Sequence, residues 1–266
     1  MANPLKIAEV AADVAKPVVS GLVDEAAALL SSSGAKGGRA LMGHGPIDWL
    51  ERAKTVVNPY LREFEATQAN PTYKRAIDIT RGRIDSTQEE YRWAFKEQMT
   101  TRYGLTHKYA WAVPNSEALA AVGGQGKIVE AGAGSGYWAH LLRSMKADVV
   151  AFDEHGSNLA ANRFHSSGRA WTEIIRGDAA TVKQYPDRSL FMSFPPADDP
   201  FAHNVLKNFN GDRFVYVGEP AGGITGDSHF HDLLARQWRE TKTVEIPRWE
   251  ASDGFLQDSL TVFERR

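Results

Sequence analysis

Short runs of apolar residues alternate with helical stretches throughout the C-terminal half of the chain. The apolar runs fall at 128–131, 149–152, 172–175, 190–194, 214–217, 243–246 and 260–263. Stretches with helical spacing fall near 137–146, 156–164, 199–208 and 227–238. Strands that alternate with helices predict an α/β fold, with a doubly wound, mostly parallel seven-stranded sheet covered on both faces. No clear helix separates the last two runs, so we expect them to form an antiparallel hairpin at one edge.

The residues before this half have helical rather than strand-like spacing. The run Ser86-Thr87-Gln88-Glu89 has the form of a capping box, which marks the start of a helix. Another helix is expected to begin at Asn115 or Ser116, immediately before the first strand. We therefore predict a helical subdomain at 46–122, followed by an α/β domain at 123–266.

The first 45 residues are predicted to form an arm and a flexible linker. Apolar residues recur every three or four positions across 5–30, as in an amphipathic helix that Pro17 would kink or divide. Residues 31–38 are rich in serine and glycine, which is typical of a linker. A loosely attached arm is one interpretation of 5–30, and self-association or partner binding is the other.

Composition narrows the possible classes of protein. The 266 residues carry a net charge of −2, so no overall basic field favours nucleic acid or an anionic membrane surface. There is no cysteine, which excludes disulfides, zinc–thiolate sites and a cysteine nucleophile. No run approaches the roughly 18 apolar residues of a membrane span, and the N-terminus lacks the pattern of a secretory signal. We therefore expect a cytoplasmic protein.

A glycine-rich turn follows the first predicted strand. The run Glu130-Ala131-Gly132-Ala133-Gly134-Ser135-Gly136 joins that strand to a helix, and glycine there allows a ligand to approach the backbone closely. Tyr137 stands where the dinucleotide pattern requires its third glycine, and a carboxylate at Glu130 would repel a diphosphate. Asp153 ends the next strand about 20 residues later, where a carboxylate can accept both hydroxyls of a ribose.

This segment resembles the class I S-adenosylmethionine-dependent methyltransferases, whose first motif has the form h-h-E-x-G-x-G-x-G. The likeness covers residues 127–266 and implies S-adenosyl-L-methionine as the cofactor. It places Glu130, Gly132 and Gly134 along the methionine part, with Ala133, Gly136 and Ser193 as further cofactor-binding residues.

The same resemblance implies that Asp153 holds the ribose. The run Ile175-Arg176-Gly177-Asp178-Ala179 matches the next motif of the family, which implies Asp178 at the adenine amino group and Ala179 beside the ring. The structural alternatives are a tight strand-to-helix turn for the glycines and a helix cap for Asp178 or Asp153.

The acceptor is expected near the end of the fourth predicted strand. Phe194-Pro195-Pro196 is similar to the [D/N/S]-P-P-[Y/F/W] motif of amino-methyltransferases, in which the carbonyl before the second proline binds the target amino group. Phe194 takes the polar position of that motif and Ala197 the aromatic one, which puts this chemistry in doubt. The candidate acceptor-binding residues are Tyr109, Trp111, Phe194 and Pro196, with ordinary packing as the alternative for Tyr109 and Trp111.

Methyl transfer relies mainly on proximity and alignment, and it needs a base only when the acceptor is protonated. The candidate catalytic residues are Glu219, His203 and Pro195, and Glu219 is favoured because it follows the fifth predicted strand. His229 and His231 are further candidates for the base. Neither has convincing metal-ligand spacing with Asp198 or Asp199, so no metal site is predicted.

We therefore expect a methyltransferase that acts on an oxygen or nitrogen of a small molecule. One alternative is a nucleic-acid amino-methyltransferase, which Pro195-Pro196 favours. Another is a non-catalytic, methyltransferase-like assembly protein that uses residues 5–30. A nicotinamide dehydrogenase is a distant third, because Glu130 and the missing third glycine argue against it.

Overall fold

The computed structural model describes residues 48–166, 168–251, 254–255 and 257–266. The arm predicted at 5–30 and the linker at 31–38 lie outside these residues. The helices are α3 (Trp49–Lys54), α4 (Pro59–Ala69), α5 (Pro71–Thr80), α6 (Gln88–Lys108), α7 (Ser116–Gly123), α8 (Tyr137–Ser144), α9 (Phe201–Asn208) and α10 (Ser228–Gln237). None of the described helices is long and apolar enough to cross a membrane.

One sheet contains the predicted strands, and the fold class is confirmed. The strands are β1 (Ile128–Ala131), β2 (Val149–Asp153), β3 (Ile175–Arg176), β4 (Ser189–Ser193), β5 (Arg213–Gly218), β6 (Trp238–Val244) and β9 (Ser259–Arg265). Their order is β3-β2-β1-β4-β5-β9-β6. The pairs among β1 to β5 are parallel, whereas β9 is antiparallel to both β5 and β6, as the expected hairpin requires.

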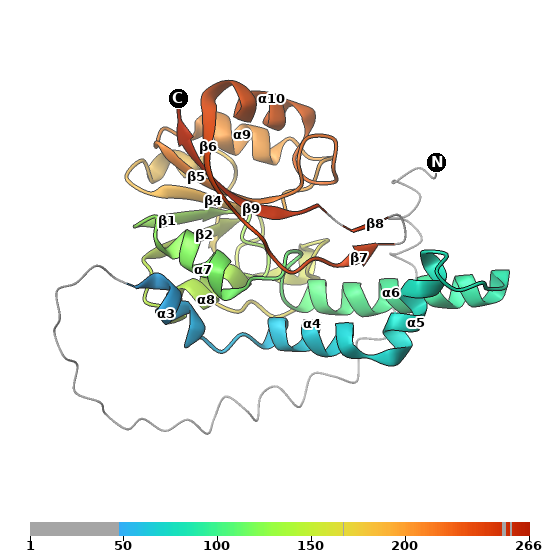
Figure 1. Ribbon diagram of the computed structural model, residues 1–266. Coiled ribbons are helices and arrows are strands. Elements are labelled where there is room, and N and C mark those ends of the chain that lie inside the picture. Colours follow the sequence, from blue (N-terminus) through green and yellow to red (C-terminus); the bar gives the residue numbers. More distant parts are fainter. Residues whose placement is uncertain (1–47, 167, 252–253, 256) are drawn as a thin grey trace, which may run out of the picture. The chain divides into compact units, whose positions relative to one another are not determined.

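Helices cover both faces of this sheet (Figure 1). One hydrophobic cluster joins α3, α4, α7 and α8 to side chains of β2, β5 and β9, and a second joins α9 and α10 to the opposite face. The first cluster includes Ala53, Tyr60 and Phe64, so the N-terminal helices share a core with the sheet. The boundaries proposed at 45/46 and 122/123 stay predictions.

Three local predictions need correction. The stretch 156–164, predicted as a helix, contains only a 3₁₀ turn, η1 (Leu159–Ala161), because Asn158 and Asn162 direct their side chains to nearby backbone N–H groups. The third strand is the two-residue β3 instead of 172–175, and β6 begins directly after α10 instead of at 243. A small pair, β7 (Glu250–Ala251) and β8 (Gly254–Phe255), was not predicted.

Both helices start where the sequence predicts, but the capping box of α6 lies one residue later than the predicted Ser86-Thr87-Gln88-Glu89. The Thr87 side chain accepts a hydrogen bond from the Glu90 backbone N–H, and the Glu90 carboxylate accepts one from the Thr87 N–H, which completes a capping box. Asn115 caps α7 through the N–H of Ala118. Asn115 also ends the segment that joins α6 to α7, and the Tyr109 carbonyl of this segment accepts a hydrogen bond from the Ser135 hydroxyl of the glycine-rich turn.

Candidate functional site

The glycine-rich turn leaves β1 at the carboxyl edge of the sheet. Gly132, Gly134 and Gly136 have φ of +71°, +57° and +75°, which glycine adopts without a Cβ penalty. The N–H groups of Gly132 and Ala133 both donate to the carbonyl of Phe152, which ties the turn to the end of β2. Parallel strands place these ends at the crevice where doubly wound folds bind their ligands.

Asp153 ends β2 beside this turn. Its Oδ2 accepts a hydrogen bond from the Gly134 N–H at 3.0 Å, and its Oδ1 accepts one from the His155 N–H at 3.2 Å. Burial raises the pKa of Asp153, and these two backbone N–H groups lower it in part. The carboxylate therefore faces the turn, and ribose binding by Asp153 stays a prediction.

Glu130 lies beneath the same turn and is 2% exposed. Within the described part of the chain, its Oε2 has no hydrogen-bond partner. Burial raises the Glu130 pKa to about 8, against the lowering effect of the Arg143 charge and of a backbone hydrogen bond from Ala139. A buried carboxyl oxygen without a hydrogen bond destabilises the folded protein. The position of Glu130 therefore favours a ligand that brings a hydrogen-bond donor or a cation to this oxygen.

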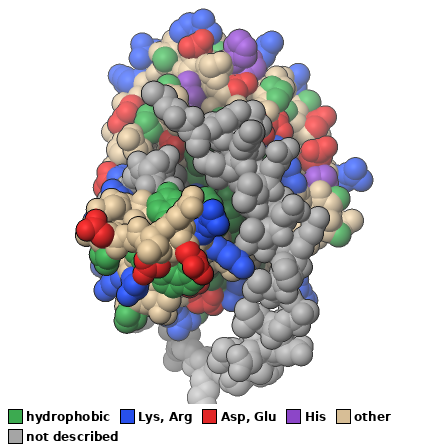
Figure 2. All heavy atoms as spheres, turned by 90° about the vertical axis from the view of Figure 1, so that its right-hand side faces the viewer, with side chains coloured by type: hydrophobic (Ala, Val, Ile, Leu, Met, Phe, Trp, Pro, Cys, Tyr) green, Lys and Arg blue, Asp and Glu red, His purple; other side chains and the backbone are tan. Residues whose placement is uncertain are grey.

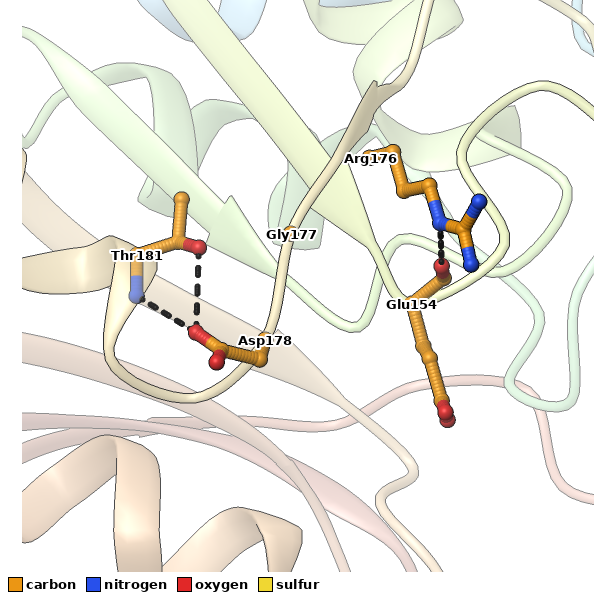
Figure 3. A pocket seen from close by; sticks show the side chains of 5 residues that line it. All are labelled: Glu154, Arg176, Gly177, Asp178 and Thr181. Carbon is orange, nitrogen blue, oxygen red and sulfur yellow. Dashed lines mark hydrogen bonds between the residues drawn. The ribbon is translucent and has the colours of Figure 1, made fainter.

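An open pocket of about 380 Å³ adjoins the ends of β2 and β3 (Figure 3). Glu154, Arg176, Gly177, Asp178 and Thr181 line it. The Asp178 Oδ1 accepts hydrogen bonds from the N–H groups of Ala180 and Thr181, but the N-cap of the 3₁₀ turn at Thr181–Gln184 is Ala180 and not Asp178. Ala179 packs partly buried against the neighbouring hydrophobic cluster.

His165 is a residue that the sequence interpretation missed. A Cβ at Gly134 would lie 2.6 Å from its Nε2, so the ring covers the turn. Its Nδ1 lies 3.1 Å from the His107 carbonyl, which can only accept, so Nδ1 carries the proton and Nε2 presents a lone pair. Burial lowers the His165 pKa to about 4, which keeps the ring neutral. No local pattern marks this histidine, because it acts across the fold.

The two aromatic candidates before α7 occupy different environments. The rings of Trp111 and Phe194 are stacked with centroids 6.1 Å apart, which places Trp111 at the end of β4. Tyr109 is buried between Tyr60 and Trp171, and its hydroxyl donates to Glu63. The contacts of Tyr109 are therefore those of the aromatic core.

The loop after β4 is paired with the loop after β5. Phe194 has φ of +55°, a strained conformation for a bulky residue that often marks a functional site. The Pro195 carbonyl accepts a hydrogen bond from the Gly226 N–H at 2.8 Å, and Pro196 bridges to Thr225. The carbonyl that would bind a target amino group thus accepts one hydrogen bond and keeps its second lone pair.

The remaining candidates are placed as follows. Both Glu219 oxygens accept backbone N–H groups, Oε2 from Ile224 at 2.7 Å and Oε1 from Gln257 at 3.0 Å. His203 lies in the first turn of α9, where its ring faces that of His229 with centroids 5.8 Å apart. Ser193 ends β4, half-buried and opposite Val217. Over the described residues there is no group of three acidic or histidine side chains that could hold a metal ion.

No family model matches the chain, and no curated protein matches its sequence. Among solved structures, it is similar to an S-adenosylmethionine-dependent methyltransferase from Anabaena variabilis, with 11% identity over 53% of this chain and 77% of that one, at a TM-score of 0.36. It is also similar to a Streptococcus pneumoniae protein described as a putative tRNA (m1A22) methyltransferase, with 14% identity over 55% of this chain and 68% of that one, again at 0.36. The 23S rRNA methyltransferase ErmE gives 13% identity over 57% and 69%, at 0.35.

Proposed function

We propose that this protein is an S-adenosylmethionine-dependent methyltransferase that methylates an oxygen or nitrogen atom of a small molecule. The observation that carries the proposal is the carboxylate of Asp153, which is held against the Gly134 N–H on the sheet order β3-β2-β1-β4-β5-β9-β6. This pairs a carboxylate suited to ribose hydroxyls with a glycine-rich turn at the carboxyl ends of parallel strands.

The chain has side chains that could bind each part of such a cofactor. The unpartnered Glu130 oxygen, which has no bond to any described residue, and the Nε2 lone pair of His165 suit the ammonium group of the methionine part. Asp153 suits the ribose hydroxyls, and the pocket at Arg176 and Asp178 suits the adenine ring.

When bound, the cofactor supplies a methyl carbon activated by positive sulfur, so an acceptor lone pair forms the new bond as the carbon–sulfur bond breaks. The contribution of the chain is alignment and exclusion of water at the strand ends. Because both Glu219 oxygens already accept backbone N–H groups, we assign Glu219 to holding the loop after β5 against Pro195. Trp111 and Phe194 form an apolar wall at the end of β4.

The nucleic-acid alternative finds less support than the small-molecule one. Phe194 and Ala197 stand where the amino-methyltransferase motif has its polar and aromatic residues. On the face drawn in Figure 2, basic and acidic side chains are interspersed and form no continuous basic surface among the atoms shown in colour. Nucleic-acid binding relies on such a surface.

One observation favours the non-catalytic alternative. The chain's own side chains pack on the glycine-rich turn, because a Cβ at Gly132 would lie 3.0 Å from Phe201 and one at Gly134 would lie 2.6 Å from His165. A methyltransferase-like protein without cofactor would retain such packing. Cofactor binding is therefore the measurement that separates the two functions.

The test is calorimetric titration of the full-length protein with S-adenosylhomocysteine. We expect binding in the micromolar range, weakened roughly tenfold or more in Asp153→Asn, because the amide cannot accept both ribose hydroxyls. Asp187→Asn is the matched control, since Asp187 is an exposed carboxylate that pairs only with Lys127 among the described residues. Absence of binding by folded wild-type protein would reject the methyltransferase and favour the non-catalytic role.

A further inference from the structure

Residues 162–165 follow η1 as a short segment, which we call the strap, and its last residue packs on the glycine-rich turn. The backbone hydrogen bonds of the strap are local turns, from the Asn162 N–H to the Leu159 carbonyl and from the His165 N–H to the Asn162 carbonyl. Within the described ranges, no backbone hydrogen bond joins the strap to a strand or to an α-helix. The strap is therefore held against the rest of the fold by its side chains.

The first and last side chains of the strap lie in the candidate cofactor site. Asn162 and His165 are both 4% exposed. The Asn162 Nδ2 lies 3.5 Å from the Oδ1 of Asp153, the carboxylate that we assign to the ribose. The His165 Nε2 lies 2.6 Å from the position of a Cβ at Gly134, so the ring fills the space above this glycine. A cofactor that contacts Gly134 has to move the His165 ring, and its ribose competes with Asn162 for Asp153.

The two middle side chains of the strap reach the other side of the crevice. The Arg163 Nη2 lies 3.4 Å from the Oδ1 of Asp198, in the loop after β4. The Phe164 ring meets the Trp111 ring edge-on, with centroids 5.9 Å apart. Because β1 lies between β2 and β4 in the sheet, the strap connects the end of β2 to the loop after β4 across the turn that follows β1.

The side-chain contacts that hold the strap are weak enough to be released. The Arg163 and Asp198 side chains are 58% and 59% exposed, and an ion pair in water contributes little to stability. The distance of 3.5 Å between Asn162 and Asp153 is at the long limit for a hydrogen bond. Among the described residues, release of the strap breaks no backbone hydrogen bond of a strand or an α-helix. Opening is therefore a local rearrangement that leaves the sheet intact.

We propose that the strap is a gate of the candidate cofactor site, closed over Gly134 in this structure and displaced when the cofactor binds. This inference rests on the proposed function, since it concerns access to the same site. Displacement clears the space above Gly134 and releases the Asp153 carboxylate for the ribose. The closed strap lowers the apparent affinity for the cofactor, because only the open fraction of the protein binds it.

The test is a reversible cross-link that keeps the strap closed. The chain contains no cysteine, so the full-length double variant Arg163→Cys/Asp198→Cys carries the only two thiols. A short bifunctional methanethiosulfonate bridges these thiols, and a reductant removes the bridge. We expect S-adenosylhomocysteine to bind the bridged protein at least roughly tenfold more weakly in calorimetry, with full recovery after reduction. Equal affinities of the bridged and unbridged proteins would overturn the proposal.

Two controls separate closure of the strap from other effects of the cross-link. The monofunctional methanethiosulfonate modifies both thiols without joining them, and S-adenosylhomocysteine should then bind normally. Lys127→Cys/Asp187→Cys places the same bridge across another exposed ion pair, just before β1 and β4, and should also bind normally. Loss of binding in either control would assign the effect to the reagent instead of the closed strap, and it would overturn the proposal.

The association rate of S-adenosylhomocysteine gives an independent readout in Phe164→Ala. This change removes the contact with Trp111 that helps to close the strap, so we expect association to be about two- to tenfold faster in stopped-flow tryptophan fluorescence. Tyr91→Ala is the matched control, because Tyr91 is an exposed aromatic residue near the start of α6, and its rate should equal that of wild type. A purely structural Phe164 would leave the rate unchanged or lower it, and either result would overturn the gate.

These measurements keep the gate and the proposed function distinct. Normal S-adenosylhomocysteine binding by the wild type, together with equal binding by the bridged strap variant, rejects only the gate. Absence of binding by the folded wild-type protein rejects the methyltransferase, and the gate with it.

Discussion

The Oδ2 of Asp153 accepts a hydrogen bond at 3.0 Å from the backbone N–H of Gly134, which joins the end of β2 to the turn after β1. The two strands are parallel neighbours, with Ala131 opposite Phe152. One carboxylate thus shapes the glycine-rich turn and remains at the edge where a ribose would bind. An asparagine at 153 keeps an oxygen for Gly134 and removes the charge, which is why Asp153→Asn tests the ligand more cleanly than a truncation.

Gly134 should tolerate alanine less well than a glycine with open surroundings. Gly134→Ala requires φ of +57° from a residue with a Cβ and drives that Cβ into His165, so we expect a loss of about 2–3 kcal/mol in the free energy of unfolding. Gly126 has φ of +85° and nothing near its Cβ position, so Gly126→Ala should lose only about 1 kcal/mol. Urea denaturation measures both. Equal losses, or no partial rescue by His165→Ala, would contradict the close packing of His165.

Glu130 should release a proton when the cofactor product binds. With a pKa of about 8, the free carboxyl is mostly protonated at pH 7, and a nearby ammonium group would lower that pKa. We expect up to about one proton released per S-adenosylhomocysteine bound at pH 7, and none in Glu130→Gln. Calorimetry in buffers of different ionisation enthalpy counts these protons. The same number in both proteins would place the ammonium group away from Glu130.

Glu130 should also make stability fall as the pH rises. Its folded pKa is raised from 4.5 to about 8, so the native state retains a proton that the unfolded chain has already lost. The stabilisation is complete below about pH 4.5 and is lost as the pH rises towards 8, at about 1.4 kcal/mol per pH unit within that window.

Glu130→Gln cannot lose a proton, so its melting temperature relative to wild type should increase from pH 5 to pH 8.5. Asp187→Asn is the comparison. Lys127 lowers the pKa of Asp187, so the melting temperature of this variant relative to wild type should change only at acidic pH. A constant difference between Glu130→Gln and wild type would mean that Glu130 is not protonated when buried.

The capping box at the start of α6 should contribute to stability through Thr87. Thr87→Ala leaves the Glu90 N–H without its cap, so we expect a loss of about 1 kcal/mol in the free energy of unfolding. Thr87→Ser keeps the hydroxyl and should lose only a few tenths of that amount. Chemical denaturation of the three proteins measures the effect, and a serine as costly as the alanine would argue against the cap.

Local patterns were enough to predict most elements of this fold. All seven predicted strands overlap strands of the sheet, although the third shares only Ile175 with β3. The start of α7 at Asn115 was also predicted correctly, whereas the capping box of α6 lies one residue later than predicted, with Thr87 and Glu90 in place of Ser86 and Glu89. Periodicity and capping depend on residues within one or two turns of each other, so the sequence displays them directly. The helix predicted at 156–164 was wrong because asparagine side chains there accept hydrogen bonds from backbone N–H groups that a helix would use.

The amino-acid sequence by itself determined the α/β class, the glycine-rich turn, and the acids at Glu130 and Asp153 that flank it. Only the tertiary structure decided that His165 covers Gly134 and that the Pro195 carbonyl is engaged by Gly226. It also decided that the charged residues Arg102 and Asp258 are buried. These relationships depend on burial and on contacts between distant segments, and no periodic pattern encodes them, because a charged residue looks the same in sequence whether it meets water or the protein interior.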